Sequence, residues 1–247
     1  MADRVPLELT SRTDYPFDEA IEITVKPARR ATFPLYFRIP GWCKNPSLVV
    51  NGSPVKAVPD ALGFVRIERR WKSGDKISLQ FPMSPRVTTG LDANASGAPY
   101  AVVYYGPLCF VLPIADMNDG NTPDPNARWK FALDTTGKEL GSDITVERKA
   151  MPALWNWPLA SPLKLHVPVQ SLEWDGKVLP GNPAVDSGRA PESITLIPYG
   201  CTKFRVALLP ITERTSKRSG LDRRLHRSGN ETAGGAPMKT RCAGQAG

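Results

Sequence analysis

The sequence has few of the side chains that build metal sites and nucleophilic sites. Its 247 residues include two histidines and four cysteines, and the cysteines at positions 43, 109, 201 and 242 form no Cys-x-x-Cys pair. Zinc ligands usually occur in closely spaced pairs, so this spacing argues against a closed metal site, and no metal or other cofactor is expected. We expect reduced, buried thiols, although spacing alone leaves a disulfide among the first three cysteines open.

Long apolar runs are also missing. No run of about 18 apolar residues occurs, and the N-terminal stretch MADRVPLELTSRTDYPF has no apolar core like that of a signal peptide. The sequence therefore predicts neither a membrane span nor a signal peptide, and no membrane partner is expected. A cytoplasmic location is favoured for the chain as written, while the compartment of any parent protein stays open.

The positive charge is unevenly distributed along the chain. The net charge is +8, but residues 213–247 hold eight Lys and Arg against three Asp and Glu, which leaves +3 for the first 212 residues. Because a nucleic-acid surface usually forms a basic stripe on the folded domain, no nucleic-acid partner is expected. Residues 213–247 are also rich in Gly, Ala and Ser and are predicted to be a disordered basic tail, with an RNA-binding arm as the alternative.

Alternation of apolar and polar residues is the dominant pattern, and 20 Gly and 25 Pro indicate frequent turns. We predict an all-β fold of two consecutive antiparallel β-sandwich domains, residues 1–90 and 91–212, followed by the tail. Two further runs, Ala101–Tyr105 and Leu108–Leu112, are nearly continuous in apolar residues, as in strands that are covered on both faces. The alternating runs are Ile21–Val25, Leu35–Ile39, Val65–Ile67, Ile77–Phe81, Leu163–Val169 and Phe204–Leu208.

Local turn signals explain the segment around Cys43. Pro40-Gly41 ends one predicted strand, and Asn51-Gly52 predicts a two-residue type I′ hairpin because both residues tolerate positive φ. Cys43 then lies at a bend with only Lys44 as a neighbouring cation, which is weak support for a thiolate. We interpret Cys43 as a small apolar residue rather than a nucleophile.

Trp155 and Trp157 are the candidate binding residues. They lie two positions apart, so on a strand they would share one face and could stack on a sugar ring. The alternative, which we favour, is that they pack against a neighbouring domain as part of an interface. The other aromatic residues considered are expected in the core or at corners, namely Tyr15, Trp42, Trp71, Trp129 and Trp174.

Three aspartates cluster at a polar loop, MNDGNTPDPNAR (Met117–Arg128). Asp119 and Asp124 lie within the loop, and Asp116 directly precedes it. Their spacing does not match a calcium-binding loop, and a solvated loop is expected. His166 projects from the polar face of its predicted strand and is expected to face solvent or an interface.

Six short motifs occur along the chain, in the order TDYPFDEAIEI (13–23), FRIPGW (37–42), VNG (50–52), WKSGDKISLQFPM (71–83), YYGPLCFVL (104–112) and ITLIPYGCTKFRV (194–206). Taken together, these motifs resemble the bacterial glycoside hydrolase family that includes β-L-arabinofuranosidases. The resemblance implies that a helical (α/α)6 catalytic barrel precedes the β-sandwich region. It also implies that a cysteine nucleophile, its zinc ion and the glutamates all belong to that barrel, so no residue here inherits a catalytic role.

The sequence thus predicts an accessory, non-catalytic β-sandwich region of such a glycoside hydrolase, with no catalytic and no metal-binding residues of its own. Its expected partners are the catalytic barrel of a parent enzyme, arabinose-containing glycans or a second copy in a homo-oligomer. The alternatives are a free-standing carbohydrate-binding module that uses Trp155 and Trp157, and a protein-interaction module.

Overall fold

The computed structural model describes residues 5–93, 97–117, 119–133, 141–153, 161–181 and 188–212, and residues 1–214 belong to one compact unit. Within these ranges the strands pair antiparallel, and a short 3-10 helix spans Tyr199–Cys201. The all-β, antiparallel class is therefore confirmed. None of the described residues forms a helix long and apolar enough to cross a membrane. The predicted tail, residues 213–247, lies outside the described residues.

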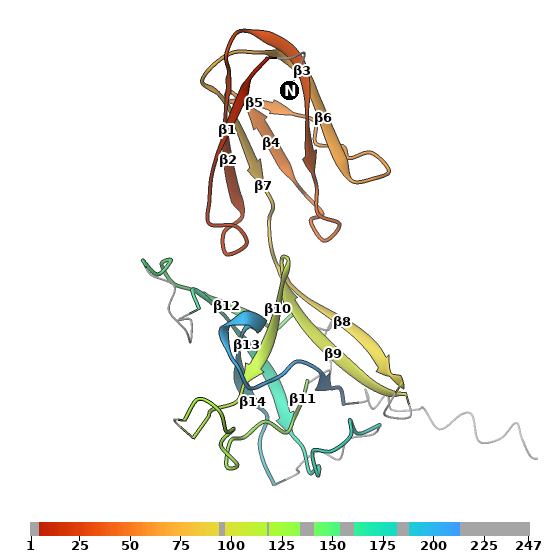
Figure 1. The fold of residues 1–247 in the computed structure, drawn as a ribbon. Helices are drawn as coiled ribbons and strands as arrows, with labels where there is room; N and C mark the ends of the chain where they lie inside the picture. The colour runs from red at the N-terminus through yellow and green to blue at the C-terminus, as the bar shows by residue number, and fades with distance from the viewer. Residues whose placement is uncertain are drawn as a thin grey trace, which may run out of the picture. The chain divides into compact units, whose positions relative to one another are not determined.

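The first part of the chain forms two sheets (Figure 1). Alternating side chains give each strand one apolar and one polar face, so the strands can stack in layers. A two-stranded sheet consists of β3 (Ala31–Arg38) and β6 (Phe64–Trp71). A five-stranded sheet has the order β1 (Leu7–Thr13), β2 (Ala20–Pro27), β7 (Asp75–Gln80), β4 (Ser47–Val50) and β5 (Ser53–Val55).

These two sheets share one apolar core. Val25, Leu48 and Ile77 from the five-stranded sheet belong to the same buried cluster as Phe33 and Trp71 from the two-stranded sheet. Trp71 is fully buried, and its indole Nε1 donates a hydrogen bond of 2.9 Å to the Phe33 carbonyl oxygen. The polar end of this large side chain is thus satisfied inside the core, as burial requires.

The rest of the chain forms a nine-stranded sheet around a second buried cluster, which includes Val103, Phe110, Leu165 and Leu196. The predicted division between residues 90 and 91 stays a prediction. The main path of the sheet is β11 (Phe131–Leu133), β13 (Leu163–Ser171), β14 (Glu192–Pro198), β10 (Leu108–Pro113), β9 (Ala98–Tyr105) and β16 (Leu209–Pro210). β12 (Thr145–Arg148) pairs with β13, β15 (Arg205–Val206) with β10, and β8 (Pro85–Asp92) with β9.

The predicted alternating strand Phe204–Leu208 is wrong in extent. The chain instead changes partner there, because β15 pairs with β10 whereas β16 pairs with β9. Leu208, predicted to face the core, lies between the two short strands and is 37% exposed. Period-two alternation identifies extended backbone but does not reveal where a strand leaves one neighbour for another.

The Asn51-Gly52 hairpin is confirmed. β4 pairs with β5 up to Val50 and Ser53, and the two turn residues have φ values of 51° and 82°. Asn51 also connects this turn to β7, since its Oδ1 accepts a 2.8 Å hydrogen bond from the Lys76 amide. Its Nδ2 donates a 2.9 Å hydrogen bond to Asp75 Oδ1.

Asp75 is an acid buried inside the first core, with 1% of its surface exposed. Its Oδ2 accepts a 3.0 Å hydrogen bond from the Lys72 amide, and its Oδ1 accepts the Asn51 amide. Burial acts to raise the pKa of Asp75, but these hydrogen bonds, with the charges of Arg69 and Lys72, outweigh it and hold the pKa below its ordinary value of 3.8. The carboxylate is therefore ionised in the fold near neutral pH.

We predict that Asn51→Gly lowers the free energy of unfolding by about 1–3 kcal/mol, because one buried acceptor of Asp75 loses its donor while the turn keeps a residue suited to positive φ. Asn51→Ala is expected to cost about 1 kcal/mol more, because its Cβ adds strain at positive φ. Urea denaturation measures both values. Equal stability of wild type and Asn51→Gly would show that the side-chain hydrogen bonds contribute nothing.

The lowered pKa of Asp75 predicts a pH dependence. A carboxyl group whose pKa is lower in the folded state stabilises the fold fully above its unfolded pKa, and this contribution disappears as the pH falls through the folded value. The wild type is therefore expected to lose stability below about pH 3.8 more steeply than Asp75→Asn, which has no proton to bind there. Urea denaturation at pH values from about 7 to about 2 gives the slope of stability against pH for both proteins. Parallel curves would contradict the assignment.

Candidate functional site

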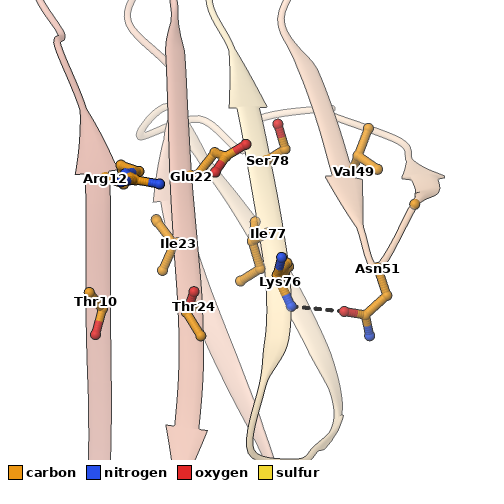
Figure 2. Close-up of a pocket in the computed structure, with 11 residues that line it drawn as sticks. Thr10, Arg12, Glu22, Ile23, Thr24, Val49, Asn51, Lys76, Ile77 and Ser78 are labelled. Carbon is orange, nitrogen blue, oxygen red and sulfur yellow. Dashed lines mark hydrogen bonds between the residues drawn. The ribbon is translucent and has the colours of Figure 1, made fainter.

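A groove of about 510 Å³ lies on the polar face of the five-stranded sheet (Figure 2). Four strands and the Asn51-Gly52 turn contribute to it. Seven of the eleven lining residues are polar, and Ile23, Val49 and Ile77 add apolar surface. The lining residues are Thr10, Arg12, Glu22, Ile23, Thr24, Val49, Asn51, Gly52, Lys76, Ile77 and Ser78.

Strand register explains how these side chains meet. Arg12 lies opposite Glu22, which in turn lies opposite Ser78, so the three form one row across β1, β2 and β7. A second row runs from Thr10 through Thr24 to Lys76. The backbone amide of Lys76 donates a hydrogen bond to the Asn51 side chain, which lies beside this row (Figure 2). Because every second residue of a strand faces the same side, the alternation that builds the core also produces this polar surface.

The charges of the groove are suited to binding more than to acid–base catalysis. Arg12 and Lys76 are cationic, and Glu22 is the one carboxylate among the lining residues. Hydrolysis of a glycosidic bond normally requires two carboxyl groups, or a nucleophile and an acid, on either side of the sugar. The lining provides a single acid next to a cross-strand arginine.

A second, smaller hollow of about 270 Å³ lies beside β11 and β13. Arg128 organises it, because its guanidinium donates to both carboxylate oxygens of Glu192, at 3.0 and 2.6 Å, and to Ser171 Oγ at 3.0 Å. The hydrogen bond from Arg128 holds the pKa of Glu192 below its ordinary value. Trp129 forms the wall and packs edge-to-face on Trp174, with ring centroids 5.4 Å apart.

The thiols are not arranged as nucleophiles. Cys43 and Cys201 are buried, Cys109 is half-buried, and all three are free. Burial raises the pKa of each thiol, which disfavours the reactive thiolate. Cys43 belongs to the first core, and its amide donates to the Pro40 carbonyl oxygen at 3.0 Å. Its interpretation as a small apolar residue at a bend is confirmed.

Acidic and histidine side chains are engaged in local contacts. In the polar loop, Asp119 accepts hydrogen bonds from the Thr122 hydroxyl and from the amides of Asn121 and Thr122, which lower the pKa of Asp119 to about 2. The His166 side chain, expected to face solvent or an interface, is 38% exposed, and it also has partners: Nε2 lies 3.0 Å from Glu147 Oε2 and Nδ1 lies 3.2 Å from Thr195 Oγ1. Neighbouring strands β12 and β14 supply these partners, which the polar face of a single strand does not reveal.

In the part of the chain that the structure describes, no three His, Cys, Asp or Glu side chains converge closely enough to hold a metal ion.

Trp155 and Trp157, the candidate sugar-binding or interface residues, lie outside the described residues. Sequence reasoning identified neither the groove nor the Arg128 cluster. The alternating runs contain the polar residues that line the groove. The sequence does not show that β2 pairs with β7, and this pairing is what brings those residues together. No sequence signal connected Arg128 with Glu192, which lies 64 residues away.

Residues 1–83 match the family model described as the middle domain of the GH127 β-L-arabinofuranosidases. Four of the six motifs that suggested this resemblance fall within that range, so the resemblance is confirmed there. No curated protein matches the chain.

Solved structures extend the likeness in fold. A GH127 β-L-arabinofuranosidase from Geobacillus stearothermophilus T6 is 22% identical, with a TM-score of 0.59 over 85% of this chain and 31% of that one. A structure titled glycoside hydrolase is 24% identical, with a TM-score of 0.58 over 84% of this chain and 32% of that one. Another GH127 β-arabinofuranosidase is 21% identical, with a TM-score of 0.59 over 85% of this chain and 32% of that one.

The chain thus spans about a third of the length of the solved structures that it matches. By sequence over residues 1–83 it resembles the middle domain of the GH127 β-L-arabinofuranosidase family, and by fold over most of its length it resembles about a third of a solved GH127 chain.

Proposed function

We propose that this chain is a non-catalytic accessory β-sandwich region of a glycoside hydrolase that resembles β-L-arabinofuranosidases, and that it supports a catalytic (α/α)6 barrel outside these 247 residues. The observation that supports this proposal most directly is the match of residues 1–83 to a middle domain rather than to a catalytic one. The likeness in fold to about a third of each solved GH127 chain is consistent with it.

The chemistry of the described side chains is also consistent with a non-catalytic, accessory role. Cleavage needs an acid and a nucleophile on opposite sides of a bound sugar. Glu22 stands as the one carboxylate in the lining of the larger groove, and Glu192 beside the smaller hollow is held by Arg128. Burial raises the pKa of the Cys43 thiol, so a thiolate there is disfavoured.

We predict that the purified chain releases no p-nitrophenol from aryl β-L-arabinofuranosides above the rate of buffer alone. A catalytically competent GH127 β-L-arabinofuranosidase serves as the positive control under the same conditions. Turnover that persists through repurification and disappears in Glu22→Gln or Cys43→Ser would show that the chain has its own active site. Both variants keep the size of the side chain, so circular dichroism can verify that each one folds.

The polar groove favours one alternative, a carbohydrate-binding module. Sugars are bound by side chains that offer several hydrogen-bond donors and acceptors on a preformed surface, and Arg12, Glu22, Lys76 and Asn51 offer these in the groove. In the proposed accessory role this surface needs no free sugar ligand. Calorimetry therefore separates the two functions.

We predict that titration of the chain with arabinose-containing oligosaccharides gives no heat beyond that of dilution. A binding isotherm that is lost in Glu22→Gln and Lys76→Ala, but kept in the control Lys203→Ala outside the groove, would favour the binding module. An isotherm that neither groove variant changes would place the sugar site elsewhere on the chain.

A further inference from the structure

Strand β1 is a sheet edge seven residues long. It is the end strand of its sheet and pairs with β2 over all seven residues, from Leu7 to Thr13, without a bulge. Among the described residues no strand pairs with its other side. The edge therefore presents backbone N–H and C=O groups that can pair with another strand. Its residues after Leu7 are exposed, and Leu9 has 51% of its surface in solvent.

Natural sheet edges are usually protected by proline, charged side chains, a bulge or a short strand. The sequence LELTSRT of β1 contains no proline, its register with β2 is continuous, and its two charged residues, Glu8 and Arg12, have opposite signs, so a second copy of the strand can pair them. An edge of this kind is suited to pairing, and its own sequence indicates the partner.

The sequence of β1 is self-complementary about Thr10. When two copies run antiparallel around a two-fold axis at Thr10, Glu8 lies opposite Arg12 of the second copy, and Arg12 lies opposite its Glu8. Opposite charges placed directly across antiparallel strands stabilise the pairing. Shifting the register by two residues loses these contacts, because either Glu8 or Arg12 then faces Thr10 of the second copy.

The charges on β2 extend this complementarity. Within one chain, Lys26 Nζ lies 2.9 Å from Glu8 Oε1, and Arg12 lies opposite Glu22. Joining two β1 edges around Thr10 therefore creates a row with the order Lys26, Glu8, then Arg12 and Glu22 of the second copy. Every neighbour in this row has the opposite charge. The two-fold axis generates the same row a second time.

We propose that a second copy of this chain pairs with β1 in antiparallel orientation about a two-fold axis at Thr10, joining the two five-stranded sheets into one continuous sheet. The partner covers the exposed Leu9 side chain and satisfies the free backbone edge. Since Thr10 and Arg12 also line the 510 Å³ groove, the grooves of the two copies become neighbours across the axis. This inference does not depend on the proposed accessory function.

Sedimentation velocity on the full chain over a concentration series tests the pairing. The wild type is expected to dimerise, whereas Glu8→Lys and Arg12→Glu should each weaken the dimer by about tenfold, because two attractive pairs become two repulsive ones. Glu173→Lys and Arg70→Glu are the matched controls, since they make the same charge changes at exposed positions outside the sheet that contains β1. They should leave the dimer unchanged.

Mixing the two β1 variants gives a sharper test. In an equimolar mixture, Lys at position 8 of one chain faces Glu at position 12 of the other, and Arg12 faces Glu8, so a heterodimer should form although each variant alone is mainly monomeric. Circular dichroism verifies that both variants fold. A wild type that stays monomeric, a dimer that both variants leave intact, or a mixture that remains monomeric would each overturn the proposal.

Crosslinking tests the register independently. Thr10→Cys, made in a Cys242→Ser background, places two thiols at the axis and should give a reducible dimer on mild oxidation. Ser11→Cys is the control, because its copies would be diagonal neighbours about 7–8 Å apart, too far for a disulfide. Equal crosslinking of both variants, or crosslinking of Ser11→Cys alone, would contradict an axis at Thr10.

Discussion

The pleat of the β-strand is the constraint on which this structure depends. Because neighbouring side chains point to opposite faces, Val25 and Ile77 enter the first core while Thr24 and Lys76, one position away, line the polar groove. Any change of register by one residue would move charges into the core and leave the groove apolar. The same strand register therefore determines both the core and the groove. The hydrogen bonds of Asn51 help to keep β4, the turn and β7 in this register.

Burial also decides what the reactive side chains can do. The same desolvation that makes Cys43 a good core residue raises its pKa and makes it a poor nucleophile. Asp75 is the counterexample, since two hydrogen-bonded neighbours keep a buried carboxylate ionised. Such acids stabilise a fold without being accessible to a substrate. The side-chain chemistry of these residues is therefore structural, in keeping with an accessory region.

Features set by a few neighbouring residues could be predicted from the sequence. The Asn51-Gly52 turn, the bend before Cys43 and most strands of the first core follow from local propensity and alternation. Features set by distant pairing could not. The hydrogen bond from Asn51 to Asp75 spans 24 residues, and the groove needs the β2–β7 register, which no local pattern specifies. The candidate binding pair Trp155 and Trp157 lies outside the described residues.

The position of β7 has a consequence for synthesis of the chain. This strand lies between β2 and β4 and is the last of the five to leave the ribosome. Until residue 80 has emerged, the nascent chain holds two separate hairpins, β1–β2 and β4–β5, with no strand to join them. By then β3 and β6 have emerged, but the core still lacks Ile77 and Leu79 of β7, so the first core is completed only by the last strand of its sheet.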